Sequence, residues 1–218
     1  MKALAKTVTV MGLMLAAMLV SGPLQAAAPA VAVNRIVPAQ PSQAAPDQIG
    51  VLVFFDFSAA SQALLGRLAQ WASGAGHRIV LDREPLIGGG NDITFARAFV
   101  VARTLGVTDS VLPGLFALAA KTPAKQTDAA ATTAIANIFK PVGINGVEFA
   151  AAWSSPAAGN GIVRARALAA RYQIAQARVV IVNGLWRLVP AADADASSLI
   201  AALNQQIAVV ASGEAANQ

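Results

Sequence analysis

The feature that most constrains the fold is the apolar run at residues 50–57, where Val, Leu and Phe follow one another with a single acid near the end. A strand that is apolar on both faces lies inside a sheet that is covered on both sides. Residues 61–73 then place leucines and a tryptophan at helical spacing, and Gly74 and Gly76 end this helix. Because another apolar stretch follows at 78–81, the chain is predicted to begin its fold with a β-α-β unit.

The rest of the chain reads as a block of helices followed by a return to the sheet. Residues 91–161 carry several short helical patterns, and a longer pattern covers 162–172. Residues 178–189 are two apolar stretches joined by Asn-Gly, which is a strong hairpin signal. Either Ser197 or Ser198 is expected to cap an amphipathic closing helix.

This order predicts the domain boundaries. The first part of the sheet domain covers 49–90, a helical insertion covers 91–161, and the second part of the sheet domain covers 162–213. The segment before them, 27–48, is rich in Ala, Pro and Gln and has no sustained period. It is therefore expected to be a flexible arm, extended or disordered, that precedes the first strand.

Residues 1–26 are expected to be a cleavable signal peptide. Lys2 and Lys6 precede an uncharged apolar run at 8–20, and small residues follow around Ala26. The run is shorter than the roughly 20 residues that cross a bilayer, which leaves a retained anchor as the lesser alternative. We therefore expect export to the periplasm without stable insertion in the membrane.

The charged and titratable residues exclude several classes of function. The chain has 16 Lys and Arg against 11 Asp and Glu, but its arginines are scattered rather than grouped with aromatic residues, so no nucleic-acid partner is expected. His77 is the single histidine, which leaves a Ser-His-acid triad or a His-based metal site without partners. The glycine run from Gly88 lacks the lysine and the spacing of a phosphate-binding loop. Neither a metal nor another cofactor is expected.

Sulfur is absent from the part of the chain that would be exported. There is no cysteine, and the four methionines all lie in the predicted signal peptide: Met1, Met11, Met14 and Met18. Such a protein cannot perform thiol chemistry. Selection for resistance to oxidation and chance both remain open as the reason.

Several short segments, in order and spacing, resemble the DsbA-type thiol:disulfide oxidoreductases. The resemblance covers about 50–211 and implies an α/β fold, a thioredoxin-like domain interrupted by an all-helical insertion. The segments that carry it are Phe54-Phe55, Leu105-Gly106-Val107, Gly146-Val147-Glu148-Phe149, Ala152-Trp153-Ser154-Ser155 and Val182-Asn183-Gly184.

The departures from this family concentrate in its chemistry. Where the family has Cys-Pro-His-Cys at the strand-to-helix turn, this chain has Ala59, Ala60, Ser61 and Gln62. The buried acid that the family uses for proton movement aligns with Val53, and its cis-proline aligns with Arg178. Because a cis peptide before a residue other than proline costs about 2.5 to 4 kcal/mol, the bond before Arg178 is expected to be trans.

The resemblance therefore implies a protein without thiol-disulfide activity that binds a polypeptide or belongs to an envelope assembly. The candidate binding residues are Phe57, Ser58, Ala59 and Arg178. One alternative is a glutathione-dependent transferase of the kappa type, in which Ser58 or Ser61 stabilises the glutathione thiolate, although helix capping would also explain both serines, and Ser61 is well placed for it. The other alternative is a decayed paralogue without a role.

Overall fold

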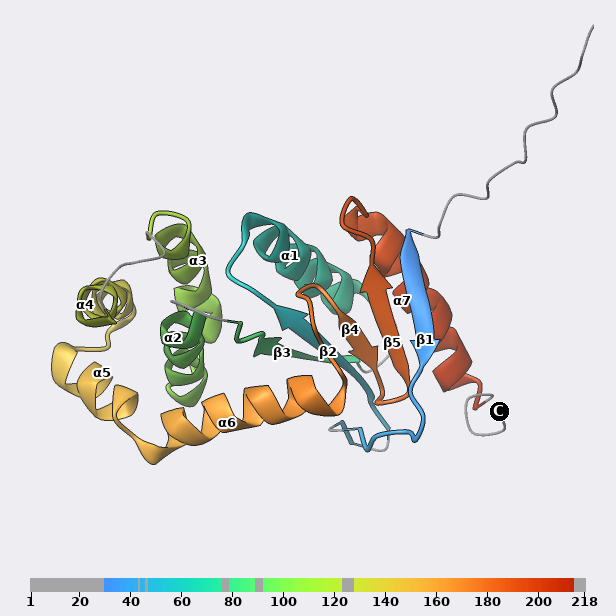
Figure 1. The fold of residues 1–218 in the computed structure, drawn as a ribbon, viewed down its shortest axis with the longest axis horizontal. Helices are drawn as coiled ribbons and strands as arrows, with labels where there is room; N and C mark the ends of the chain where they lie inside the picture. The colour runs from blue at the N-terminus through green and yellow to red at the C-terminus, as the bar shows by residue number, and fades with distance from the viewer. Residues whose placement is uncertain are drawn as a thin grey trace, which may run out of the picture.

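The computed structural model describes residues 30–42, 44–45, 47–75, 79–88, 92–122 and 128–213. These residues form one mixed sheet in the order β1-β5-β4-β2-β3, with helices on both of its faces (Figure 1). The strands are β1 (Val31–Arg35), β2 (Ile49–Phe55), β3 (Ile79–Pro85), β4 (Val180–Val182) and β5 (Trp186–Pro190).

Helices α1 and α7 pack on one face of the sheet and α6 on the other, while the remaining helices lie beyond the β3 side (Figure 1). None of the described helices is long and apolar enough to span a bilayer. The helices are α1 (Ala59–Gly74), α2 (Asp92–Thr104), α3 (Thr108–Ala119), α4 (Asp128–Phe139), the 3-10 turn η1 (Lys140–Val142), α5 (Gly146–Trp153), α6 (Pro156–Arg171) and α7 (Ala196–Ala211).

Strand β2 lies inside the sheet, as its sequence predicts. It pairs in parallel with β3 and antiparallel with β4. Val51, Val53 and Phe55 pack in the core beneath α1 and α7, whereas Leu52 and Phe54 pack against α6. Both faces of β2 are buried, which explains why its sequence lacks a polar alternation.

Strand β1 corrects the prediction that 27–48 is an arm before the first strand. Val31–Arg35 pairs antiparallel with β5 and forms an edge of the sheet. Ala32, Val33 and Asn34 are exposed in it. An edge strand can be held by backbone hydrogen bonds to one neighbour, so it needs no continuous apolar pattern that sequence reasoning could detect.

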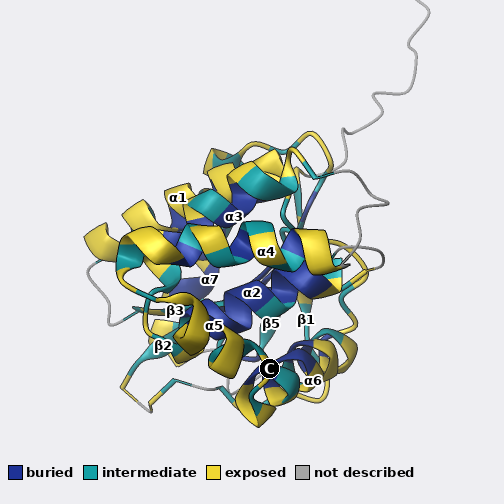
Figure 2. Cartoon of the chain, turned by 90° about the vertical axis from the view of Figure 1, so that its left-hand side faces the viewer, coloured by how far each residue is buried: buried dark blue, intermediate teal, exposed yellow. Residues whose placement is uncertain are grey.

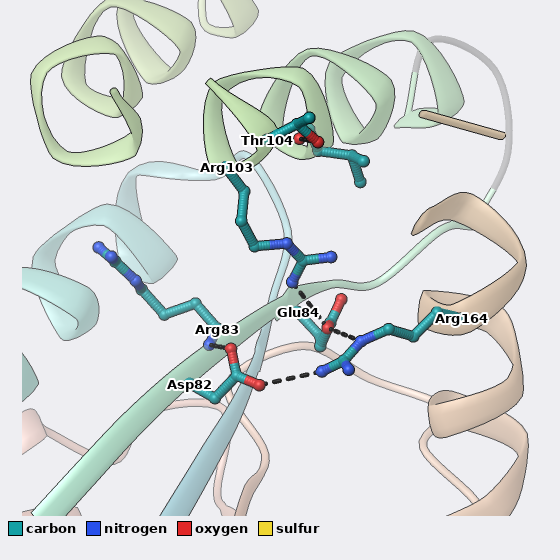
Figure 3. Close-up of polar contacts among 7 residues, drawn as sticks. Asp82, Arg83, Glu84, Arg103, Thr104 and Arg164 are labelled. Carbon is teal, nitrogen blue, oxygen red and sulfur yellow. Dashed lines mark hydrogen bonds and ion pairs between the residues drawn. The ribbon is translucent and has the colours of Figure 1, made fainter. Parts of the chain in front are cut away.

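Strand β3 continues past its predicted end at Leu81 because ion pairs neutralise its charged residues. Glu84 is fully buried, and its Oε1 accepts hydrogen bonds from Arg103 Nη1 on α2 and Arg164 Nε on α6, each at 2.8 Å (Figure 3). Arg164 Nη2 also binds Asp82 Oδ2 at 3.0 Å. This cluster ties the sheet to a helix of the insertion and to α6.

The helical insertion has its own core, centred on α2. Eight of the thirteen residues of α2 are buried, and Figure 2 shows this helix surrounded by helices whose outer faces are exposed. Phe95, Val101, Leu115, Ile135 and Phe139 are among the residues that form this core.

Helix α6 begins earlier than the predicted 162, at Pro156, where Ser155 caps it by accepting a hydrogen bond from Ala158 N at 3.2 Å. The predicted boundary between 161 and 162 thus falls inside a continuous helix. Gly161 lies within this helix, and its lack of a side chain is required there. A Cβ at this position would overlap Val100 Cγ1 on α2.

Asp195, rather than Ser197 or Ser198, caps α7, and its Oδ1 accepts from Ser198 N at 2.7 Å. The predictions about the signal peptide, His77 and the glycine run beyond Gly88 concern segments outside the described residues.

Candidate functional site

The strand-to-helix turn forms where β2 ends at Phe55 and α1 begins at Ala59. Ala59, Ala60 and Gln62 are exposed on the first turn of α1, whereas Ser61 is fully buried. The four positions that align with the family motif therefore present two methyl groups and an amide to the surface, with one hydroxyl directed inward.

Asp56 organises this turn through its hydrogen bonds with two serines. Its Oδ1 accepts from Ser58 Oγ at 2.6 Å and from Ser61 Oγ at 2.5 Å. Ser58 is the N-cap residue, and its hydroxyl oxygen accepts from Ser61 N at 3.2 Å. The hydroxyl of Ser61 also accepts from Asp56 N at 3.3 Å. Ser61 is thus not the cap that the sequence favoured but a buried link between the strand end and the helix.

The charge of Asp56 is stabilised in this environment. Burial raises the pKa of Asp56, but the hydroxyls of Ser58 and Ser61, together with backbone hydrogen bonds, outweigh burial and hold the pKa below its usual 3.8. A carboxylate therefore lies at the positive end of the α1 dipole. Sequence reasoning missed Asp56, although an acid between a buried strand and a helix start is a recognisable capping signal.

The same network bears on the transferase alternative. A hydroxyl has one proton to donate. Ser58 and Ser61 both donate theirs to Asp56. This arrangement leaves neither serine with a proton for a glutathione thiolate.

Val53, which the resemblance aligns with the family's buried acid, is completely buried in the core beneath α1 and α7. Its register partners are Arg83 on β3 and Val180 on β4. No charge replaces the family's acid at this position of the strand.

Arg178, which the resemblance aligns with the family's cis-proline, has a left-handed backbone conformation. Its φ is +68°, in the left-handed region that side chains rarely adopt. Its N–H donates to Phe54 O at 2.7 Å, and Val179 O accepts from Phe54 N at 2.9 Å. A proline could not donate the first of these hydrogen bonds. In the described ranges the one cis peptide precedes Pro38, so the bond before Arg178 is trans, as predicted.

A pocket of about 200 Å³ opens between the N-terminal ends of α1 and α7. It brings together Ala60, from the degenerate motif, and Arg178, from the loop before β4. The complete lining is Ala60, Ala63, Leu64, Arg178, Pro190, Ala194, Asp195, Ala196 and Leu199.

The other predicted site residues lie elsewhere. Phe57 packs between the sheet core and the insertion core, with its ring centroid 5.4 Å from that of Phe95 and 5.6 Å from that of Phe116. Gln62 lines a separate groove of about 290 Å³ that includes residues of α1 and α3. Ser58 and Ala59 are exposed at the turn without lining the pocket between α1 and α7.

In the part of the chain that the structure describes, no three His, Cys, Asp or Glu side chains come together as a group that could hold a metal ion. What the site offers chemically is an apolar floor, one guanidinium and the capped ends of two helices.

Comparisons with known proteins support the fold. No family model matches the sequence, and no curated protein does. DsbA from Pseudomonas aeruginosa superposes with a TM-score of 0.70 at 18% identity, over 83% of this chain and 94% of that one. DsbA from Xylella fastidiosa gives 0.68 at 20% identity, over 81% and 95%. A complex of Proteus mirabilis DsbA with the non-covalently bound peptide PWATCDS gives 0.60 at 19% identity, over 80% and 94%.

These superpositions cover nearly all of each solved structure, so they include both the sheet domain and the insertion. The fold predicted from short segments is confirmed. This chain is therefore DsbA-like in fold, a thioredoxin-like domain interrupted by a helical insertion, and it has no cysteine.

Proposed function

We propose that this chain is an exported DsbA-like protein that binds a polypeptide without covalent chemistry. The observation that carries the proposal is the pocket that contains both Ala60 and Arg178. It opens where the degenerate motif and the replaced proline come together, and the chain has no thiol that could react there.

The absence of cysteine restricts what this site can do to a ligand. Thiol-disulfide exchange proceeds through a mixed disulfide, which requires a thiolate on the protein. Asp56 supplies the negative charge at the start of α1, but its carboxylate is committed to two serines and a backbone amide. Binding through shape and polar contacts remains available.

Two observations support a polypeptide ligand. The Proteus mirabilis DsbA in the superposed complex binds a peptide non-covalently, so this fold accommodates such a ligand without a disulfide bond. The pocket of this chain has an apolar floor that includes Leu64, Pro190 and Leu199. At about 200 Å³ it is smaller than the roughly 300 Å³ at which small-molecule pockets begin, which suits a peptide side chain.

The proposed location follows from the first 26 residues. Their basic start, apolar run and small residues around Ala26 are typical of a cleavable export signal. A periplasmic polypeptide or an envelope assembly is therefore the proposed partner.

Titration of the labelled peptide PWATCDS, followed by fluorescence anisotropy, tests the proposal. Ala60 is exposed and lines the pocket, so Ala60→Trp is expected to fill it and to weaken binding at least tenfold. Gln70→Trp is the matched control, because Gln70 is exposed on the same helix and lines neither groove beside it.

Both variants are expected to unfold at the temperature of the parent protein. Binding that is equal in the parent and in Ala60→Trp would place the ligand elsewhere. No binding of peptides to the parent protein would contradict the function itself.

A further inference from the structure

Arg178 is held in one place at its backbone and at the tip of its side chain. The peptide N–H donates to Phe54 O on β2, and the guanidinium Nη2 donates to Ala192 O at 3.2 Å in the turn before α7. With both ends of the residue fixed, the side chain of Arg178 lies along the wall of the pocket.

The positive charge of Arg178 has no carboxylate partner among the described residues. Its guanidinium contacts a carbonyl oxygen, and no ion pair joins it to an acid there. Asp195 lines the same pocket, but its carboxylate accepts from Ser197 Oγ at 2.8 Å and from Ser198 N at 2.7 Å. The remaining N–H groups of a guanidinium are suited to a carboxylate, which they can bind with two parallel hydrogen bonds.

Arg178 is the cation of a lining that also offers apolar side chains. The pocket lies at the N-terminal ends of α1 and α7, where helix dipoles are positive. Asp56 and Asp195 place carboxylates at these two helix ends, so the cationic contact of the lining comes from Arg178 and not from the helix dipoles. Leu64 and Leu199 supply the apolar contact.

We infer that the pocket selects polypeptides that carry a carboxylate, which binds Arg178 while a neighbouring apolar side chain occupies the floor. This inference rests on the proposed function and names its ligand class. The carboxylate can belong to an Asp or Glu side chain or to a chain terminus, since both present the same two oxygens.

The experiment compares four labelled peptides that share the sequence PWATCDS. One is unchanged, one has Asn in place of its aspartate, one has an amidated C-terminus, and one has both changes. In the parent protein, loss of the responsible carboxylate is expected to weaken binding roughly fivefold, the upper end for a partly exposed ion pair. The peptide that shows this loss identifies the source of the carboxylate.

The Arg178→Gln variant distinguishes a role of Arg178 in selecting the carboxylate of the ligand from a role in holding the loop through Ala192. Loss of the contact with Ala192 would weaken all four peptides equally, whereas loss of selection makes the four affinities converge. Arg178→Lys, which keeps the charge, is expected to retain part of the preference and serves if the glutamine variant does not fold. Arg166→Gln on α6, an exposed arginine outside this pocket, controls for net charge and should leave the preference unchanged.

The outcomes distinguish the two proposals. If the parent protein binds all four peptides with equal affinity, the inference is overturned and the peptide-binding function stands. The inference is also overturned if the preference persists in Arg178→Gln. If the parent protein binds none of the peptides, both proposals fail. High salt is expected to reduce the preference in the parent protein, because the pair is partly open to solvent.

Discussion

Asp56 is the residue whose side chain organises the start of α1 in this chain. The thiolate of a DsbA-type cysteine is stabilised at the start of a helix by its dipole and amides. In this chain a carboxylate lies at the same helix end and is bound by Ser58 and Ser61. The turn of this chain thus carries a negative charge, but the charge belongs to a carboxylate and not to a reactive thiolate.

Asp56→Asn is expected to destabilise the protein by about 1 kcal/mol near neutral pH, because a partly exposed charged acceptor with two hydroxyl donors is lost. The folded state holds the pKa of Asp56 below 3.8, so its stabilisation is complete above that value and declines as the pH falls through the folded-state pKa. Urea unfolding near pH 7 and near pH 3 should therefore show a smaller difference at the lower pH.

Asp193→Asn removes the same charge from an exposed position in the turn before α7 and is the control for net charge. Its stability should remain close to that of the parent protein at neutral pH. A difference between parent and Asp56→Asn that stays constant on acidification would mean that Asp56 is not the stabilised carboxylate.

At the scale of elements, the start of α6 is the feature that the sequence pattern predicted wrongly. The predicted helix began only at 162, after Gly159 and Gly161. In the structure Gly161 lies where α2 approaches, against Val100, while Gly159 has no heavy atom within 4 Å of a would-be Cβ. Packing against α2 thus requires a glycine at 161 but does not require one at 159.

Alanine substitutions at these two glycines should have opposite effects. Gly159→Ala is expected to stabilise the protein by about 0.5 to 1 kcal/mol, the usual gain in a helix interior. Gly161→Ala is expected to destabilise it by about 1 to 3 kcal/mol, because the new methyl group overlaps Val100. Chemical denaturation measures both.

Combining Gly161→Ala with Val100→Ala should recover part of the loss, since the smaller side chain makes room. Stabilisation by Gly161→Ala alone would show that the helices lie further apart.

Sequence patterns predicted the elements whose burial leaves a local signature. The interior strand β2, helix α1 and the β4-β5 hairpin were expected from their residues, although α1 starts two residues earlier than predicted. Strand β1 and the charged end of β3 were missed, because their partners come from distant segments: β5 for the first, Arg103 and Arg164 for the second. At the candidate site, Arg178 was identified from the resemblance. The role of Asp56 became apparent only from its hydrogen bonds with Ser58 and Ser61 in the structure.

At the scale of the whole molecule, the DsbA-like fold is present in a chain that has no cysteine. Ala59→Cys combined with Gln62→Cys is expected to form an internal disulfide under oxidant, because the alignment places these two positions, at the start of α1, where the family's Cys-Pro-His-Cys motif has its two cysteines. Thiol titration before and after reduction measures the bond. The single variant Ala59→Cys is the control.

Insulin reduction by the double variant should remain far below that of an active DsbA. The Asp56 carboxylate disfavours a thiolate at the start of α1, and Arg178 stands in place of the proline. Failure to form the bond would contradict the alignment of the turn, and full exchange activity would contradict the importance given to these two residues.

Removal of the helical insertion would disrupt the buried ion pairs of Glu84. One of its two guanidiniums, from Arg103, belongs to the insertion, and Val100 on the same helix packs against α6. Excision of the insertion would leave a buried carboxylate with half of its compensation and expose the apolar side of α6. Uncompensated buried charge costs about 3 to 5 kcal/mol, a large share of a domain's stability. In this chain the sheet domain therefore depends on the insertion for part of the charge compensation of Glu84 and for covering the apolar side of α6.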